Sequence, residues 1–143
     1  MTISTVAVGL DGSATAAEAV KMAAELARRF QGKLVLLSAF RELGKTPPNP
    51  ASDVVELQWT TSSAARVREI VARTEKRLRQ EGIDCSTMIG EGDPADVLVQ
   101  LAHQSGADVL VVGNKGMERR LLGSVPNTVT HKAGCSVLVV KTT

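Results

Sequence analysis

The sequence predicts an α/β protein with three layers, in which helices cover both faces of a five-stranded parallel sheet. Strand-like and helix-like segments alternate along all 143 residues. Residues 3–9 and 34–40 are runs of apolar residues with little polar alternation, which is typical of strands buried on both faces. Strands that alternate with helices pair in parallel through right-handed crossovers. The expected sheet is doubly wound, with strand order 3-2-1-4-5.

The amino-terminal half contains two of these strands and two helices. After the strand at residues 3–9, apolar side chains recur at helical spacing up to Phe30, with Ser13 in the N-cap position and Gly32 beyond the end. The second strand spans residues 34–40. Residues 41–53 hold three prolines and a glycine, so a loop is expected there. Residues 54–80 return to helical spacing, with Trp59 near the start packing the helix down.

The carboxyl-terminal half supplies three more strands. Residues 83–89 are partly polar, which indicates a strand at the sheet edge, and Asp93-Pro94 opens a helix that ends at Gly106. Residues 107–113 form the most hydrophobic strand, which we place at the sheet centre. A short helix from Ser124 to about Gly134 leads to the last strand at residues 136–141.

Length and composition indicate a single domain, residues 1–143, with an aliphatic core. The chain has 43% hydrophobic residues but no Tyr, one Trp and two Phe. Such a chain lacks the aromatic side chains on which single-stranded nucleic acids stack. A net charge of +2 is too small to indicate a nucleic-acid or membrane partner. The basic residues between 66 and 79 alternate with acids, as on a solvated helix face.

Cysteine usage and hydropathy predict a cytoplasmic protein without a membrane insertion. Cys85 and Cys135 are far apart and lack the spacing of a metal site, so we expect free thiols in a reducing compartment. The first residues lack a basic stretch and reach Asp11 too soon for a signal peptide. No apolar run approaches the roughly 18 residues that a membrane span requires.

The predicted topology brings two glycine-containing loops to one crevice. Ligands of doubly wound sheets bind beyond the carboxyl ends of the strands, where the strand order reverses. This point lies between strands 1 and 4. Strand 1 ends in Gly9-Leu-Asp-Gly-Ser13, and strand 4 ends in Gly113-Asn-Lys-Gly116. Ala39, at the end of strand 2, is expected beside the same crevice.

The second loop has the features of a phosphate cradle. Gly113 and Gly116 allow close backbone approach, and Lys115 and Arg119 add positive charge. Gly123-Ser124 then stands at a helix start, where unpaired N–H groups attract anions. The alternative is an ordinary turn that uses glycine for its positive φ. The chain contains neither a P-loop nor a Gly-x-Gly-x-x-Gly turn after strand 1.

Asp11 has two compatible interpretations. Its carboxylate can accept hydrogen bonds from ribose hydroxyls or help to hold Mg²⁺ near phosphates. It can also cap the turn formed with Gly12 and Ser13.

The chain resembles the universal stress protein family over essentially its whole length. The matching segments are Val6-Ala-Val-Gly-Leu-Asp-Gly-Ser13, Gly92-Asp-Pro-Ala-Asp-Val-Leu98, Ala107-Asp-Val-Leu-Val-Val-Gly-Asn-Lys-Gly116, Leu122-Gly-Ser-Val-Pro-Asn-Thr-Val129 and Cys135-Ser-Val-Leu-Val-Val140. The resemblance implies a Rossmann-like, adenine nucleotide alpha hydrolase-like fold. It also implies a homodimer that pairs through residues 136–141, where apolar side chains on an exposed edge would otherwise favour aggregation.

The resemblance further implies a site for an adenine nucleotide. Asp11 would contact adenosine and Ala39 would lie near adenine. The phosphates would lie against Gly113, Gly116, Gly123, Ser124 and Val125. The neighbouring residues Gly9, Leu10, Val112, Asn114, Lys115 and Arg119 complete the predicted set, and Asp11 would help to hold Mg²⁺ by way of the phosphates.

The glycine loop of this chain is three residues shorter than the family's ATP-binding pattern. That pattern is Gly-x2-Gly-x9-Gly-Ser/Thr, whereas six residues separate Gly116 from Gly123 here. The deletion either trims the outer loop or tightens the phosphate end against a γ-phosphate. The expected ligand is therefore ATP, with AMP or cyclic AMP as alternatives.

Three functions remain open at this point. The first is a nucleotide-binding stress-response or signalling module without rapid turnover. The second is a slow ATPase or nucleotidyl transferase, with Asp11 holding Mg²⁺ and Lys115 or Arg119 stabilising phosphate charge. The third is an adaptor that binds protein partners and no nucleotide. His103 and His131 have no neighbours that form a catalytic triad, so we expect both on the surface.

Overall fold

The protein forms a five-stranded parallel sheet in the order β3-β2-β1-β4-β5, as the sequence predicts. The computed structural model describes residues 2–11, 14–41, 64–114 and 125–141. The strands are β1 (Thr5–Gly9), β2 (Lys33–Phe40), β3 (Cys85–Glu91), β4 (Val109–Gly113) and β5 (Ser136–Val140). β3 is an edge strand, as its polar residues indicate. β4 is internal but not central, because the middle of the sheet is β1.

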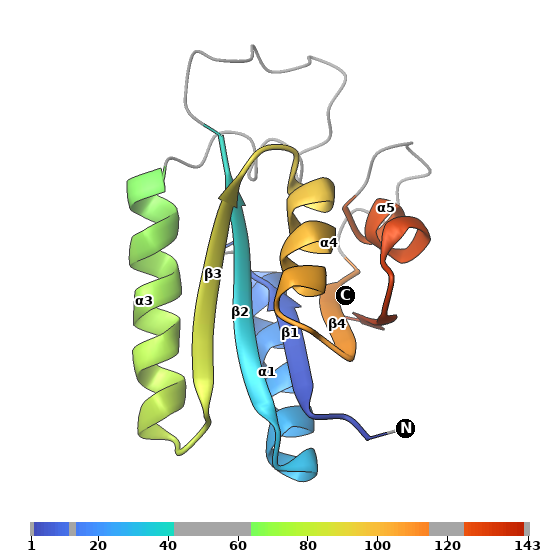
Figure 1. Ribbon diagram of the computed structural model, residues 1–143. Coiled ribbons are helices and arrows are strands. Elements are labelled where there is room, and N and C mark those ends of the chain that lie inside the picture. Colours follow the sequence, from blue (N-terminus) through green and yellow to red (C-terminus); the bar gives the residue numbers. More distant parts are fainter. Residues whose placement is uncertain (1, 12–13, 42–63, 115–124, 142–143) are drawn as a thin grey trace.

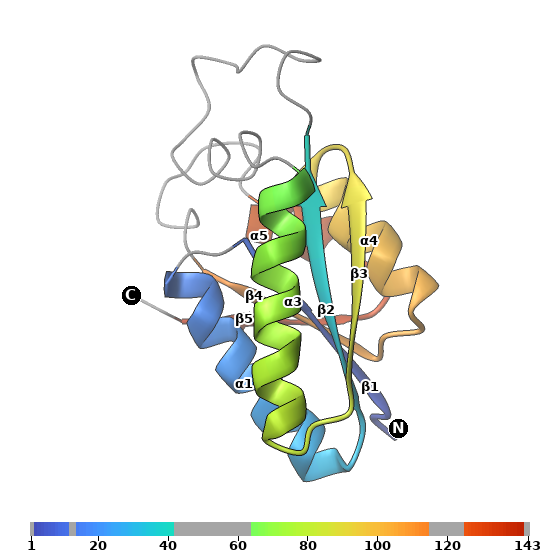
Figure 2. The same ribbon diagram turned by 90° about the vertical axis from the view of Figure 1, so that its left-hand side faces the viewer.

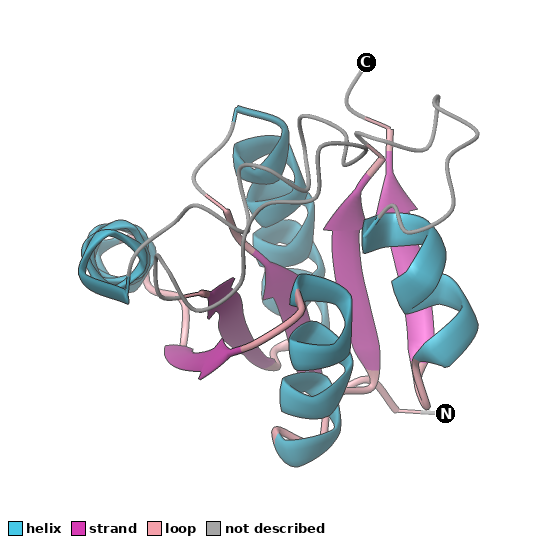
Figure 3. Cartoon of the chain, turned by 90° about the horizontal axis from the view of Figure 1, so that it is seen from above, coloured by secondary structure: helices cyan, strands magenta, loops and turns pink. Residues whose placement is uncertain are grey.

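Helices cover both faces of the sheet and complete the three layers (Figures 1 and 2). α1 (Ala14–Phe30) and α3 (Ala64–Gln80) pack on one face, and α4 (Pro94–Gln104) and α5 (Val125–Lys132) pack on the other. Viewed from above, the sheet runs between these two pairs of helices (Figure 3). The predicted loop, Trp59 and the Ser13 N-cap lie outside the described residues.

Each face of the sheet has its own aliphatic core. On the α1/α3 side, Val6, Val8, Leu34 and Leu36 are inaccessible to solvent. On the α4/α5 side, the corresponding residues include Ala7, Leu37, Leu98 and Leu110. Successive residues of a strand point to opposite faces, so each strand contributes to both cores. This two-sided burial explains why the strands read as continuous apolar runs.

The residues predicted to begin and end α4 have the expected structural roles. The Asp93 carboxylate accepts a hydrogen bond from the backbone N–H of Asp96 (3.2 Å), and Pro94 occupies the first turn of α4. Gly106, just beyond the end of α4, has a φ of +69°, which glycine adopts without steric cost. In the described part of the chain no helix is long and apolar enough to cross a membrane.

Candidate functional site

The carboxyl ends of β1 and β4 lie next to each other at the point where the strand order reverses. The two strands pair in parallel, with Val6 opposite Val109 and Val8 opposite Val111. The chain leaves the sheet at this end after each strand: β1 continues into Leu10 and Asp11, and β4 continues into Asn114. The described parts of the two predicted loops are therefore neighbours, although their central residues are separated by about one hundred positions in the sequence.

Gly9 lets the end of β1 pack closely against the helix layer below the crevice. A Cβ atom added at Gly9 would lie 3.0 Å from Leu98 Cδ1 and 3.7 Å from Val112 Cγ1. Val112 and Val125 are buried in the same core as Leu98. Gly9 thus packs on an apolar base of buried side chains that includes Val112 and Val125, which are not exposed for polar contacts.

Strand β2 holds the chain beyond the end of β1. The backbone N–H of Leu10 donates to the carbonyl of Leu37 (2.8 Å), which extends the strand pairing past Gly9. The hydroxyl of Ser38 donates to the carbonyl of Leu10 (2.5 Å). Ser38 was not among the predicted site residues. The signal that marks it is a single hydroxyl within the apolar run of residues 34–40.

The other predicted site residues that the structure describes lie at the carboxyl ends of the strands and differ in solvent exposure. Asp11, Gly113 and Asn114 are half-buried. The backbone N–H of Asn114 donates to the carbonyl of Val140 (2.9 Å), so the end of β5 supports the turn after β4. Ala39 is 1% exposed and its methyl group packs in the α4/α5 core, which leaves its backbone as the part that can meet a ligand. Lys115, Gly116, Arg119, Gly123 and Ser124 lie outside the described residues.

A salt bridge stands at the neighbouring end of β2. Arg41 Nη2 lies 3.4 Å from Asp93 Oδ1, and Asp93 also caps α4. The pair joins the chain that leaves β2 to the start of the helix on the α4/α5 face. Both partners are partly exposed, so the contact orients these side chains more than it stabilises the fold.

The predictions for metal ligands, for the two histidines and for the basic helix face concern residues that the structure describes. Groups of three or more potential ligands among His, Cys, Asp and Glu are absent from this part of the chain. His103 and His131 are both exposed, as predicted. The basic side chains of α3 pair along the helix, for example Arg73 with Glu69 (2.7 Å), which fits a solvated face.

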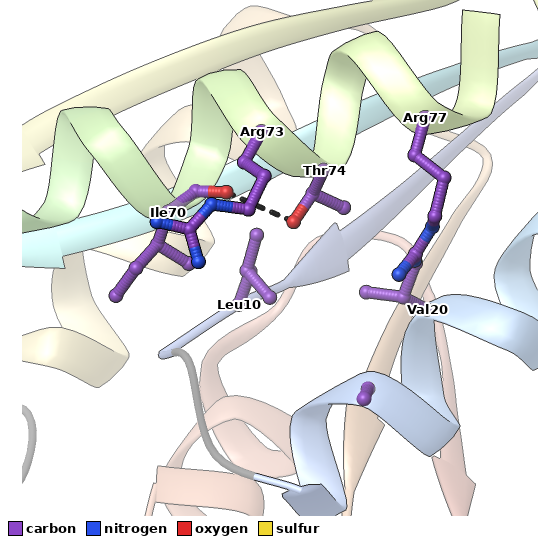
Figure 4. Close-up of a pocket in the computed structure, with 7 residues that line it drawn as sticks. Leu10, Val20, Ile70, Arg73, Thr74 and Arg77 are labelled. Carbon is purple, nitrogen blue, oxygen red and sulfur yellow. Dashed lines mark hydrogen bonds between the residues drawn. The ribbon is translucent and has the colours of Figure 1, made fainter. Parts of the chain in front are cut away.

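A groove of about 190 Å³ lies between α1 and α3, on the face opposite the apolar base (Figure 4). Its walls include Ile70 and the two arginines Arg73 and Arg77, and its floor is Leu10 and Val20. The floor residues are only 4% and 1% exposed, so the groove offers little apolar surface to a ligand. Leu10, the residue before Asp11, therefore lines this groove with its side chain.

Comparison with known proteins identifies the family. Residues 2–141 match the model of the Universal stress protein family. The chain belongs to this family. A universal stress protein of Mycobacterium tuberculosis is 36% identical over 146 residues, with 97% of each chain covered.

Solved structures of universal stress proteins share the fold. The crystal structure of a universal stress protein in complex with cAMP superposes with a TM-score of 0.78 at 33% identity, with both chains fully covered. Universal stress protein UspA from Lactobacillus plantarum superposes with a TM-score of 0.75 at 24% identity and covers 98% of this chain and 99% of its own. The Rossmann-like architecture predicted from the sequence is therefore confirmed.

Proposed function

We propose that this universal stress protein binds an adenine nucleotide, with ATP as its ligand, in the crevice between the carboxyl ends of β1 and β4. The observation that carries the proposal is the adjacency of Gly9–Asp11 and Gly113–Asn114 at the reversal of strand order. The 33% identical relative that was crystallised with cAMP supports an adenine nucleotide as the class of ligand. Cyclic AMP is accordingly the main competitor of ATP.

In this proposal the two loops have different tasks. Asp11 accepts hydrogen bonds from the ribose hydroxyls, and the backbone beside Ala39 faces adenine. Gly113 and Asn114 begin the turn that approaches the phosphates, which Gly116, Gly123, Ser124 and Val125 continue. Lys115 and Arg119 balance phosphate charge, and Mg²⁺ enters with ATP beside Asp11.

Ligand identification is the most direct test. Mass spectrometry of the supernatant released by heating freshly purified protein should detect an adenine nucleotide. Thermal unfolding should then be measured with Mg-ATP, AMP and cyclic AMP. A ligand at 100 times its Kd stabilises the protein by about 2.7 kcal/mol. Absence of both a released nucleotide and a thermal shift would reject the proposal and favour an adaptor that binds no nucleotide.

The identity of the nucleotide and any hydrolysis of ATP can be measured separately on the same purified protein. A larger shift with cyclic AMP than with ATP would reject ATP as the ligand but retain the site. Steady phosphate release from ATP that disappears in folded Asp11→Ala would identify the slow ATPase. We expect no such release, since the protein is proposed to be a stress-response and signalling module.

The glycine at the end of β4 provides a test of the site itself. Gly113→Val places a branched side chain where the phosphates must approach, so the nucleotide-dependent stabilisation should disappear. Gly134→Val, at an exposed position with no heavy atom within 4 Å of an added Cβ, is the matched control. Undiminished ATP affinity in Gly113→Val would remove the phosphate cradle from the proposal.

We also propose that the protein is a cytoplasmic homodimer that pairs through β5. β5 is an edge strand, and Val137, Leu138 and Val139 are only partly buried on its two faces. An apolar edge of this kind is protected when it pairs with another strand. Sedimentation velocity at micromolar concentration should give the mass of a dimer, and a monomer would contradict this assignment.

A further inference from the structure

We propose that Ser38 is a positioning residue of the nucleotide site: its hydroxyl fixes the peptide group that joins Leu10 to Asp11 and so sets the place of the Asp11 carboxylate. The inference rests on the proposed function, because it requires a ligand that Asp11 contacts. It adds a second residue from β2, next to Ala39, to a site built mainly on β1 and β4.

The geometry places this hydrogen bond directly before Asp11. β1 ends at Gly9, and Leu10 is the first residue beyond it. Its N–H is bonded to Leu37 and its carbonyl accepts from Ser38, so β2 holds Leu10 through both of its backbone polar groups. The carbonyl of Leu10 and the N–H of Asp11 belong to one planar peptide group. Fixing that carbonyl therefore fixes the direction in which Asp11 leaves the sheet.

The burial of Ser38 requires its hydroxyl to have a hydrogen-bond partner within the protein. Among the residues whose burial is described, Ser38 is the one polar residue in the buried class, at 2% exposure. A buried hydroxyl is unfavourable unless it forms a hydrogen bond. Alanine would satisfy the packing of β2 at this position without that requirement. The bond to Leu10 accounts for the hydroxyl, and packing alone does not.

Removal of the hydroxyl should act locally. The Leu10 side chain is 4% exposed and packs in the α1/α3 core, where it lies among Val20, Ile70 and Thr74 (Figure 4). This anchor and the bond from the Leu10 N–H remain in Ser38→Ala. The carbonyl of Leu10 loses its partner, and the peptide before Asp11 gains freedom to rotate. Ligand binding must then restrict that motion, which lowers affinity.

The test compares ATP with 2′,3′-dideoxy-ATP by isothermal titration calorimetry. The parent protein should prefer ATP, because Asp11 accepts hydrogen bonds from ribose hydroxyls that the dideoxy analogue lacks. Ser38→Ala should bind ATP roughly tenfold more weakly while its affinity for the dideoxy analogue changes little. The ratio of the two affinities should therefore shrink. A general loss of stability would not change this ratio.

Two further variants separate the hydrogen bond from packing. Ser105→Ala is the matched control, because Ser105 Oγ donates to the Ala102 carbonyl (2.9 Å) at the far end of α4. It removes the same kind of bond and should leave the ratio unchanged. Ser38→Thr keeps a hydroxyl donor on a residue suited to strands and should restore the preference for ATP. If Ser38→Ala does not fold, Ser38→Cys, with its weak thiol donor, should show the same reduced ratio.

The possible results distinguish this inference from the proposed function. A parent protein that binds no adenine nucleotide rejects both. A parent that prefers ATP to the dideoxy analogue, together with a Ser38→Ala variant of unchanged ratio, rejects only the role of Ser38. A reduced ratio that Ser38→Thr does not restore assigns the effect to packing and likewise overturns the inference.

Discussion

Two aspartates lie at opposite ends of the β1–β4 strand pair, and their surroundings differ. At the amino ends of the strands, Asp108 Oδ2 accepts hydrogen bonds from the backbone N–H groups of Ser4 (2.9 Å) and Thr5 (3.0 Å) and from the Ser4 hydroxyl (3.2 Å). These backbone bonds hold the pKa of Asp108 below its usual value. At the carboxyl ends, Asp11 follows a peptide group that Ser38 holds.

With the nucleotide site proposed above, this difference puts a stabilising contact at one end of the two strands and ligand binding at the other. At the amino ends of the two strands, called the closed end below, hydrogen bonds within the protein join β1 to β4. The carboxylate of Asp108 accepts from backbone donors, and the Asp108 N–H donates to the carbonyl of Thr5 (2.9 Å). At the carboxyl end, β1 and β4 stop at Gly9 and Gly113, where a ligand can approach the backbone. Open α/β sheets bind ligands outside the carboxyl ends of their strands, at the point where the strand order reverses.

The largest effect is expected for a glycine at the closed end. A Cβ added at Gly32 would lie 2.7 Å from the carbonyl oxygen of Ser4, which also accepts from the Lys33 N–H. Gly32→Ala should therefore lower the free energy of unfolding by about 2 to 3 kcal/mol in urea denaturation. ATP affinity should not change in the folded protein. Gly134→Ala, with open space around it, should be neutral or slightly stabilising. Equal stability of the two variants would show that Gly32 is not sterically restricted.

The second prediction compares variants in which each of the two aspartates is replaced by alanine. Asp11→Ala should weaken ATP binding roughly tenfold in calorimetry and should lower the unfolding temperature less than Asp108→Ala does. Asp108→Ala should lower the unfolding temperature by several degrees and leave ATP affinity unchanged, because it removes the acceptor for three donors far from the ligand. Unchanged ATP binding in Asp11→Ala, or weakened ATP binding in Asp108→Ala, would contradict the separation of the two ends.

The sequence predicts the strands and helices better than it predicts these end contacts. Apolar runs specify the strands, and Asp93-Pro94 specifies the start of α4, because both signals are local. The bond from Ser4 to Asp108 joins residues 104 positions apart, and that from Ser38 to Leu10 joins residues 28 positions apart. No periodicity encodes such pairs. The ends of β1 and β4 could be placed side by side from the sequence because the strand order determines which strand ends are neighbours.

The prediction that residues 107–113 form the central strand was wrong because hydrophobicity is also a local signal. Hydrophobicity indicates that a strand is buried on both faces, and β4 meets that condition with four of its five residues buried. It does not distinguish between the third and fourth places in the strand order.

The difference in stability between the parent and Asp108→Ala should depend on pH through the Asp108 carboxylate. Since the pKa of Asp108 is lower in the folded protein than in the unfolded chain, its contribution is present above the unfolded value, about 3.9, and is lost as the pH falls through the folded value. The difference in stability between the parent and Asp108→Ala should therefore be constant near neutral pH and shrink below about pH 4. Urea unfolding at several pH values checks this. A difference that grew on acidification would have the wrong sign.

The smallest effect is expected for the thiols, which lie at the starts of edge strands at the closed end. Burial raises the pKa of Cys85 to about 11 and also raises the pKa of Cys135. The thiolate is the reactive form, so iodoacetamide at pH 8 should leave Cys85 of the native protein unmodified and label Cys135, which is partly exposed, slowly. Unfolding in urea should make both react. Saturating ATP should not change the native labelling rates, because the proposed nucleotide site lies at the other end of the strands. Protection of Cys135 by ATP would show that the two ends are coupled.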